Sequence, residues 1–303
     1  MLEFHPLHPG EREAYQALLL DSPPRGCEYS FGNLCLWGRQ QVAFLDGCVA
    51  FVVCLPGRTV YPYPMGPGNR RQALEAVLAH ASGLGIPCHL TGLTAADCRE
   101  LESWFPGRFS ILEDRNSWDY VYAVHDLADL PGRTFQKKRN HLNRFRAAHP
   151  HCHVEPLGSH NLPQAQQMVN DWYVRRKQQH PQGDYLPEAI AITRAFQRFD
   201  ALGLVGIALV EAGEILGVTM ASPMGRDTYD VHFEKAREEV PGAYAAANQA
   251  LAQYLRERNP QTRFLNREDD LGLEGLRRAK LSYHPHHMVE KFQAREKEGN
   301  DGD

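Results

Sequence analysis

Residues 264–285 of this chain read FLNREDDLGLEGLRRAKLSYHP. The apolar start predicts a strand, and the later leucine and alanine residues recur at helical spacing, so we expect a helix over residues 271–282. Asp270 is placed to cap this helix, because its carboxylate can accept from the unpaired amides of a first turn. Asn266, Arg267 and Glu268 occupy the intervening turn, where α/β folds place ligands. A ligand site and a solvated charged turn both fit this segment.

The composition is that of a globular protein long enough for two domains. Of 303 residues, 43% are hydrophobic and 23% are charged, and the formal net charge is −4. This balance excludes a globally basic nucleic-acid binder and leaves a local basic patch open. The best membrane candidate, residues 42–55, holds Asp46-Gly47 at its centre and therefore predicts two short strands around a turn, so no membrane span is expected. Seven cysteines without a CxxC pair, and a start without signal-peptide features, predict a cytoplasmic protein with reduced thiols.

Strand and helix signals form two successive α+β units, residues 1–125 and residues 126–303. In the second unit a hairpin over residues 204–222 turns at Ala212-Gly213. No residue-level repeat links the units, so any duplication is one of architecture. The polar tail, residues 294–303, is expected to be frayed.

A predicted helix over residues 135–147 lies in a window without acidic residues. Its helical wheel places Lys137 and Arg144 on the outer face and Arg139 on the face that should pack. An inward arginine needs an anion, because an unpaired buried charge is costly. That anion is either a structural carboxylate such as Glu268 or the carboxylate or phosphate of a ligand. The outer stripe is either a solvated face or a contact to an RNA backbone.

Residues 229–234, YDVHFE, alternate as a strand and place Asp230, His232 and Glu234 on one face. A carboxylate two residues from a histidine on the same face can orient the ring and favour its protonated form. That arrangement suits a general base that deprotonates an amine. The other interpretation is the wet side of an antiparallel strand.

A helix is expected over residues 243–258, directly after Pro241-Gly242. The free amides of a helix start can hold phosphate, although the nearby Glu238 and Glu239 would repel an anion. Tyr244 and Asn248 share one face of this helix. They would either line a cleft or act as buried hydrogen-bonding partners.

Histidine clusters in residues 149–153 and 284–287 lack helical spacing and a suitably placed carboxylate, so exposed turns are expected in place of a metal site. The sequence contains no nucleophile elbow, Walker loop or GxGxxG motif.

Several segments together resemble a known family. The matching segments are RNHLNR at residues 139–144, HFEK at 232–235, NREDDLG at 266–272, LRRAKLSYHP at 276–285 and YSFGNLCLW at 29–37. They are similar to bacterial proteins of unknown function grouped with the C-terminal domain of phosphatidylglycerol lysyltransferase. The resemblance implies two GNAT-type acyltransferase folds in tandem, each a mixed, mainly antiparallel sheet flanked by helices, related to Fem-type aminoacyl transferases. Members of that wider group move an aminoacyl residue from tRNA, or an acyl group from coenzyme A, onto an amine or hydroxyl.

In the GNAT pattern, the strand over residues 229–234 and the start of the helix at Ala243 flank the cleft for the acyl donor. The pyrophosphate loop of that pattern is rich in glycine and basic residues, whereas the loop here supplies only Arg237 and Gly242. This departure weighs against coenzyme A.

The residue patterns and the resemblance together predict a transferase site in residues 126–303. Catalysis is assigned to His232 as the proton acceptor, Glu234 as its orienting carboxylate and Tyr283 as the proton donor to the leaving group. Substrate binding is assigned to Arg139, Asn248, Asn266, Arg267, Glu268 and Asp270. Donor binding is assigned to Lys137, Lys138, Arg144, Gly242 and Tyr244.

We expect no tightly bound cofactor and no metal. Acyl-CoA or aminoacyl-tRNA would serve as a co-substrate, and the acceptor would be a small molecule. The alternative function is a non-catalytic GNAT-fold protein that senses a small anionic ligand or RNA.

Overall fold

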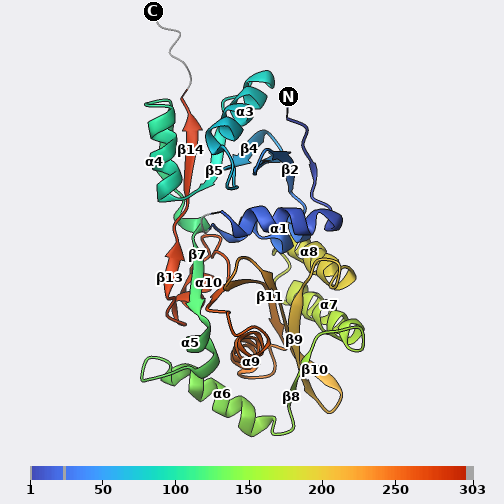
Figure 1. The fold of residues 1–303 in the computed structure, drawn as a ribbon. Coiled ribbons are helices and arrows are strands. Elements are labelled where there is room, and N and C mark those ends of the chain that lie inside the picture. The colour runs from blue at the N-terminus through green and yellow to red at the C-terminus, as the bar shows by residue number, and fades with distance from the viewer. Residues whose placement is uncertain (1, 23–24, 298–303) are drawn as a thin grey trace, which may run out of the picture. The chain divides into compact units, whose positions relative to one another are not determined.

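The computed structural model describes residues 2–22 and 25–297, and it divides the chain into two compact units (Figure 1). The first unit holds the described residues up to Asp119, together with residues 269–277 and those from Met288 onward. The second unit holds residues 120–268 and 278–287. Each unit is built on one sheet with helices against it, which confirms the predicted α+β class.

The sheet of the first unit has seven strands among the described residues, in the order β1-β2-β3-β4-β5-β14-β6. Their bounds are β1 His5–Pro6, β2 Gln40–Leu45, β3 Cys48–Leu55, β4 Arg58–Pro62, β5 His89–Leu93, β14 Phe292–Glu296 and β6 Phe109–Glu113. β2 and β3 pair around Asp46-Gly47, which confirms the predicted hairpin. β4 and β5 pair in parallel and so need a crossover, which α3 provides.

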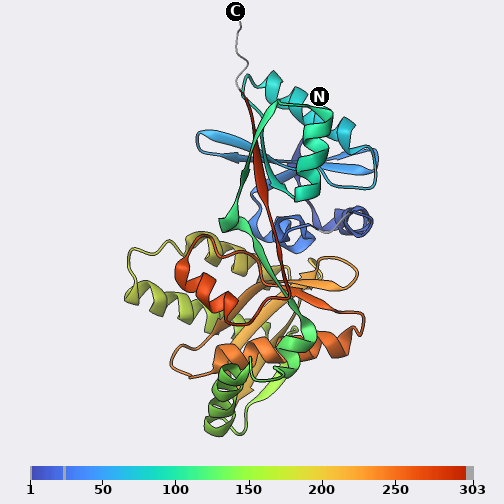
Figure 2. The ribbon, with the colours of Figure 1, turned by 90° about the vertical axis from the view of Figure 1, so that its left-hand side faces the viewer.

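The helices of the first unit are α1 Arg12–Leu20, α2 Phe31–Trp37, α3 Arg70–Gly83 and α4 Ala95–Trp104. Their starts follow from the sequence, since Ser30, Asn69 and Thr94 each accept a first-turn amide of the helix that follows. The core between α3 and the sheet holds Tyr61 and Leu74 without exposure. α4 lies beside the dark red strand β14 (Figure 2).

The sheet of the second unit is also formed by seven strands, in the order β13-β7-β12-β11-β10-β9-β8 within the described ranges. Their bounds are β13 His287–Val289, β7 Asp119–Ala123, β12 Phe264–Asn266, β11 Thr228–Ala236, β10 Glu214–Pro223, β9 Val205–Glu211 and β8 His153–Pro156. The hairpin β9–β10 turns at Ala212 and Gly213, whose φ angles are 51° and 78°, as its sequence predicts.

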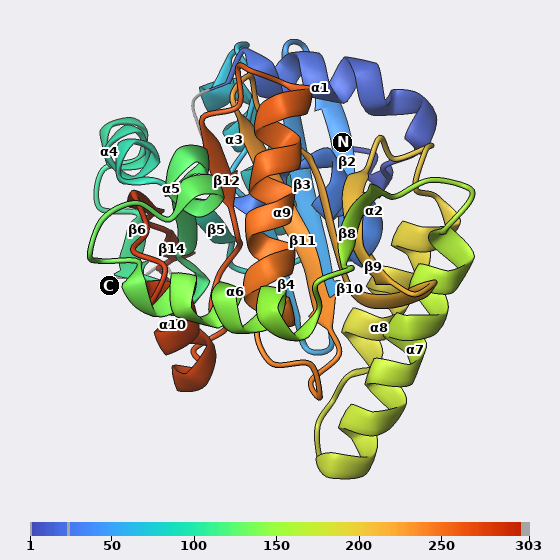
Figure 3. The ribbon, with the colours of Figure 1, turned by 90° about the horizontal axis from the view of Figure 1, so that it is seen from below.

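The helices after β7 are α5 Val124–Asp129, α6 Gln136–Ala148, α7 Leu162–Gln179, α8 Leu186–Gln197, α9 Ala243–Arg258 and α10 Glu274–Leu281. The predicted bounds of α9 are confirmed, and Figure 3 shows this helix along β11. Successive strand residues point to opposite faces of a sheet. Glu234 contacts Asn248 on α9, whereas Lys235 contacts Glu188 on α8. α9 and α8 therefore cover opposite faces of the second sheet.

The sheets assign two segments differently from a contiguous division at residues 125 and 126. β7 pairs with β12 in the second sheet, and β14 pairs with β5 and β6 in the first. The predicted frayed tail is therefore wrong for residues 294–296, because β14 pairs with β5 on one side and with β6 on the other. Residues 298–303 lie outside the described part of the chain. The last helix begins at Glu274, later than predicted, because Leu271 and Gly272 have φ angles of 51° and 73°.

Candidate functional site

The candidate site lies in the second unit, where β11 and β12 part. The two strands pair in parallel only from Thr228–Phe264 to Asp230–Asn266, although β11 continues to Ala236. The side chains of the residues after β12 therefore meet the side chains of the unpaired half of β11. This places two polar groups next to each other along one strand face, the first around His232 and the second around Glu234.

The first group is a chain of hydrogen bonds through His232. Its Nε2 lies 2.8 Å from Ser222 Oγ, and its Nδ1 lies 3.3 Å from Glu268 Oε1 and 3.5 Å from Asp230 Oδ2. The side chains of His232 and Asp230 are fully shielded, whereas the side chain of Glu268 is 19% exposed. Glu268 is thus the member of this group that solvent reaches.

Two sequence-based assignments change as a result. Glu234 does not orient His232, since the carboxylates beside its ring belong to Glu268 and Asp230. The reason is the parting of β11 and β12, which brings Glu268 to the ring from another segment. Direct contact between His232 and a substrate amine is also incompatible with a ring that is fully shielded.

Glu268 is held in place by its own turn. Its φ angle is 56°, a left-handed conformation that is uncommon for a residue with a side chain. Asn266, which is completely buried, accepts from the Glu268 amide at 2.8 Å. The Glu268 carbonyl in turn accepts from Tyr120 on β7 at 3.2 Å. Asn266 therefore acts as a positioning residue, and backbone strain of this kind is often stored at functional sites.

The second group is centred on the ion pair between Arg267 and Glu234. Arg267 Nη2 lies 3.2 Å from Glu234 Oε1, and Asn248 on α9 donates to Glu234 Oε2 at 3.2 Å. The guanidinium carbon lies 5.5 Å and 5.0 Å from the ring centres of Tyr122 and Tyr283. Both side chains of the ion pair are 14% exposed, so this group also has an open edge.

Lys138 joins this group from α6. Its Nζ donates to Ser282 Oγ at 2.7 Å and lies 3.6 Å from the ring centre of Tyr283. Burial and the nearby Arg267 lower the pKa of Lys138 to about 8. Burial raises the pKa of Tyr283 to about 12, so its phenol keeps its proton at neutral pH.

Two predicted substrate-binding residues lie elsewhere. Arg139 donates to the carbonyls of Leu130 and Gly132 at 2.5 and 2.6 Å, so neither Glu268 nor a ligand is needed as its partner. Asp270 belongs to the first unit, where it is fully buried and accepts from Arg277 Nε at 2.8 Å. Arg139 and Asp270 therefore both stabilise the local structure. The sequence pattern does not distinguish that role from ligand binding.

The predicted donor residues also separate. Lys137 and Arg144 are exposed on α6, while Gly242 begins α9 with a φ angle of 88°. A Cβ atom on Gly242 would lie 2.6 Å from the carbonyl oxygen of His141, so close packing of α6 accounts for this glycine. Tyr244 is the second residue of α9, and burial raises its pKa to about 12.

A cavity of about 470 Å³ lies between α7 and the loop that leads into α9. It is lined by Met168, Asp171, Trp172, Arg175, Gln179, Arg237, Glu238 and Glu239. Arg175 pairs with Glu239, and Arg176 pairs with Glu238 at 3.2 Å. These pairs cancel the positive charge that a pyrophosphate group would need.

Two features of the site were not predicted from the sequence, namely Ser222 and the environment of Lys138. Ser222 pairs with Asp230 across the β10–β11 ladder, after an irregularity in the register between Met220 and Ala221. A register shift of one residue changes which face a side chain takes, and the sequence contains no signal for it. Lys138 was recognised as basic, but its contact with Tyr283 depends on two segments far apart in the chain.

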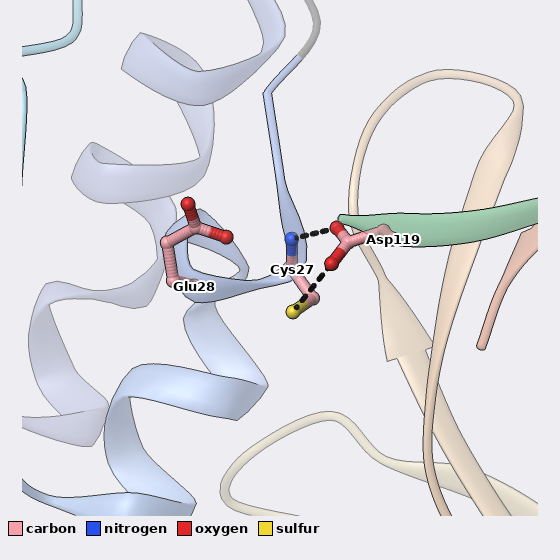
Figure 4. A group of neighbouring side chains, drawn as sticks. All are labelled: Cys27, Glu28 and Asp119. Atoms are coloured by element: carbon pink, nitrogen blue, oxygen red, sulfur yellow. Dashed lines mark hydrogen bonds between the residues drawn. The ribbon is translucent and has the colours of Figure 1, made fainter. Parts of the chain in front are cut away.

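Two groups of side chains have the composition of metal ligands among the described residues. One is Asp230, His232 and Glu268, and the other is Cys27, Glu28 and Asp119 in the first unit (Figure 4). In the second of these, Lys291 Nζ lies 2.7 Å from Asp119 Oδ1 and 2.5 Å from Glu28 Oε2. The lysine therefore supplies the positive charge that a metal would bring, and this cluster is explained as a buried ion network.

Comparisons with known proteins define the class. The model of the family described as "Phosphatidylglycerol lysyltransferase, C-terminal" matches residues 21–295, and the chain belongs to this family. A conserved protein of unknown function from Bacteroides thetaiotaomicron is 34% identical, with a TM-score of 0.91 over 98% of this chain and all of the other. The resemblance inferred from the sequence motifs is therefore confirmed.

More distant structures show the fold. The L-PGS of Bacillus licheniformis has a TM-score of 0.69 at 14% identity, covering 96% of this chain and 92% of its own. A tandem GNAT protein from the clavulanic acid biosynthesis pathway has a TM-score of 0.50 at 12% identity, covering 99% and 100%. The predicted tandem GNAT-like architecture is thus confirmed, and the family relates the chain to lysylphosphatidylglycerol synthases.

A curated relative, an uncharacterized protein of Mycoplasmoides gallisepticum, is 24% identical over 196 residues. The match spans 61% of that protein's length and 64% of this chain. Within the described residues, every helix falls short of the length or the apolar character that crossing a bilayer requires.

Proposed function

We propose that this protein transfers an acyl or aminoacyl group to an amine or hydroxyl at the open edge of the second unit. The observation that carries the proposal is Glu268, a solvent-reached carboxylate fixed in a left-handed turn and hydrogen-bonded to a shielded histidine. A carboxylate in this setting suits proton acceptance from an attacking nucleophile. The family and the GNAT-like fold support a transferase.

In the proposed reaction, the acceptor nitrogen or oxygen attacks the carbonyl carbon of the donor. Glu268 takes the proton of the nucleophile, and His232 is a positioning residue that holds its carboxylate. The bond from the carbonyl carbon to the donor oxygen or sulfur then breaks. The Tyr283 phenol gives its proton to that leaving atom, and the Lys138 ammonium 3.6 Å from the ring centre stabilises the phenolate.

For the donor, an aminoacyl-tRNA fits better than acyl-CoA. The loop before α9 carries Glu238 and Glu239, and the arginines beside them are already paired. A pyrophosphate group would have to displace these pairs. The exposed Lys137 and Arg144 are free to contact an RNA backbone.

A non-catalytic ligand-binding protein is the second candidate. The observation that favours it is the complete shielding of His232 and Asp230, which is typical of a buried hydrogen-bond network. In that case the cavity of about 470 Å³ beside Trp172 would hold the ligand.

Glu268→Gln tests the proposal, because it keeps the size of the side chain and removes the base. Donor consumption is measured with a mixture of radiolabelled aminoacyl-tRNAs and with labelled acetyl-CoA, in the presence of a small-molecule extract as the acceptor source. We expect Glu268→Gln to lower the rate by about 100-fold or more, a usual contribution of a general base. Glu257→Gln, on the exposed side of α9, is the matched control and should keep the rate. Wild-type protein that consumes no donor, or a Glu268→Gln variant as fast as wild type, would contradict the proposal.

A further inference from the structure

Asp230, His232 and Glu268 bring together three side chains of the kinds that bind zinc. Each offers one ligand atom, and the three atoms all lie within 4.8 Å of one another. Asp230 and His232 are alternate residues of β11 and therefore share a face of the strand. Glu268 reaches the His232 ring from the turn after β12. The group thus combines one imidazole and two carboxylates within the second unit.

The contacts of His232 Nδ1 fit a shared metal ion better than a shared hydrogen. Nδ1 lies 3.3 Å from Glu268 Oε1 and 3.5 Å from Asp230 Oδ2, whereas a charge-assisted N–H···O bond is about 2.7–2.9 Å long. The single hydrogen on Nδ1 also serves only one carboxylate at full strength. Two atoms that bind one tetrahedral zinc ion at about 2.0–2.2 Å lie about 3.3–3.6 Å from each other.

The surroundings of these three side chains also suit a metal site. His232 Nε2 lies 2.8 Å from Ser222 Oγ, and a histidine that binds a metal through one nitrogen normally donates a hydrogen bond from the other. Asn266 accepts from the Glu268 amide and so fixes the turn that carries the third ligand. The side chains of His232 and Asp230 are fully shielded, as buried groups that coordinate metals are. Glu268, whose side chain is 19% exposed, leaves one side open to an entering ion and to a water molecule.

The Cys27 cluster of the first unit shows what distinguishes the Asp230 group. Between Asp119 and Glu28 lies the ammonium of Lys291, so a permanent cation already occupies the central position. In the Asp230 group, the atom beside both carboxylates is a ring nitrogen. A ring nitrogen can exchange its hydrogen for a metal ion, whereas the lysine ammonium blocks one.

We propose that Asp230, His232 and Glu268 form a zinc site with a water molecule as the fourth ligand. Zinc binding releases the Nδ1 hydrogen of His232 to solvent as a proton, and Nε2 donates to Ser222. One consequence rests on the proposed transferase function, in which Glu268 is the base. A zinc ion on Glu268 competes with the proton of the nucleophile, so zinc inhibits the reaction and the metal-free protein is the active form.

Zinc binding is measured by competition between the metal-free full chain and a chromophoric chelator. We expect one zinc ion per chain at this site, and Asp230→Asn and His232→Gln should each weaken its binding by about 100-fold or more because a ligand is lost. Ser222→Ala removes only the partner of Nε2 and should weaken it by about 10–100-fold. His153→Gln is the matched control. It breaks an exposed contact with Glu155 and should keep the wild-type affinity.

Cobalt in place of zinc tests the geometry, because a tetrahedral Co²⁺ ion absorbs visible light much more strongly than an octahedral one. We expect strong bands in wild type that Asp230→Asn removes. Circular dichroism checks the fold of each variant, and Ser222→Ala keeps the test decisive if the ligand variants fold poorly. The inference is overturned if wild type binds no zinc, if the folded variants of Asp230, His232 and Ser222 bind zinc as tightly as wild type, or if the cobalt bands are octahedral.

The outcomes distinguish the zinc site from the proposed function. Zinc binding that depends on Asp230, in a protein that consumes no donor, keeps the site and rejects the transferase. Donor consumption that Glu268→Gln slows, and that saturating zinc leaves unchanged, keeps the transferase and rejects the zinc site.

Discussion

The two units use buried charge in opposite ways. In the first unit, Arg25 and Asp97 form a bidentate pair at 2.9 and 3.0 Å, with side chains that are 1% and 2% exposed. In the second unit, Arg267 and Glu234 are paired at 3.2 Å, and each is 14% exposed. A closed pair of charges holds a structure together, whereas a pair with an open edge can also meet a ligand. This difference supports placing the function in the second unit.

Unsatisfied atoms alone do not separate the units. Arg25 Nε has no partner among the residues that the structure describes, but its guanidinium lies 5.1 Å and 5.6 Å from the ring centres of Tyr29 and Tyr63 and is almost fully shielded. Exposure at the edge of the charge network is what distinguishes the Glu234 group.

The largest effect is expected from breaking the closed pair. Asp97→Ala removes the carboxylate partner of Arg25, one of the two carboxylates paired with Arg70, and the half of the α4 capping box that accepts from Thr94, so Arg25 loses its anion while Arg70 keeps Glu100. Loss of one partner of a buried pair costs about 3–5 kcal/mol of unfolding free energy. Glu234→Gln, which breaks the open pair, should cost only about 1–2 kcal/mol. Urea denaturation monitored by hydrogen exchange of each unit measures both values.

If Asp97→Ala and Glu234→Gln lower the unfolding free energy equally, the contrast between the units fails. The open pair would then contribute as much to stability as the closed one. The double variant Arg25→Met with Asp97→Leu is the control. It should recover much of the stability, because an uncompensated charge and not the missing attraction is the main cost.

The closed pair also predicts an acid limit for the first unit. Burial alone would raise the pKa of Asp97, but Arg25 and the bonds from Thr94 outweigh it, and the net pKa is lowered. A depressed carboxyl pKa contributes stability that is present above the unfolded value near pH 4 and lost as the pH falls through the folded value. In wild type, the unfolding free energy of the first unit should therefore fall steeply below about pH 4. Asp97→Asn should flatten this slope, and an unchanged slope would assign the acid limit to other carboxyls.

A smaller, pH-dependent effect is expected at the open edge. Burial and Arg267 lower the pKa of Lys138 to about 8, so its charge beside Tyr283 is lost over a range in which other lysines keep theirs. Donor consumption should decline above about pH 8 in wild type. Lys138→Arg keeps the charge. It should therefore move this decline, the alkaline limb of the pH–rate profile, upward by at least about one pH unit.

The matched control is Lys137→Arg on the adjacent exposed position of α6, which should leave the limb in place. If the limb is also unchanged in Lys138→Arg, another group titrates there. A limb that moves in Lys138→Arg alone sharpens the assignment of the open edge as the reacting face.

Much of the architecture was predictable from local sequence. The turns at Asp46-Gly47 and Ala212-Gly213 and the bounds of α9 follow from glycine positions and periodicity. β14 was missed because its pairing partners lie about 200 residues away in sequence. His232, Glu234 and Glu268 were singled out from the sequence, but Ser222 and the contacts among these residues were not predicted. His232 pairs with Glu268 and not with Glu234 because β11 and β12 part after three residue pairs, which is a property of the sheet.

The smallest expected effect is a difference in stability between two glycine variants, one in each unit. Gly57 in the first unit and Gly242 in the second have φ angles of 75° and 88°. A Cβ atom on Gly57 would meet nothing within 4 Å, so Gly57→Ala should cost only the backbone strain of about 1 kcal/mol. Gly242→Ala adds a contact of 2.6 Å with the His141 carbonyl and should cost measurably more in thermal unfolding.

The same pair of variants tests whether Gly242 acts in donor binding or only in packing. If packing of α6 is its whole role, Gly242→Ala lowers the melting temperature while donor affinity, measured at a temperature where the variant is folded, stays at the wild-type value. A loss of donor affinity without a larger loss of stability than in Gly57→Ala would return Gly242 to the donor site. The start of α9 would then be a second ligand-contacting region of the second unit, beside the open edge at Glu234.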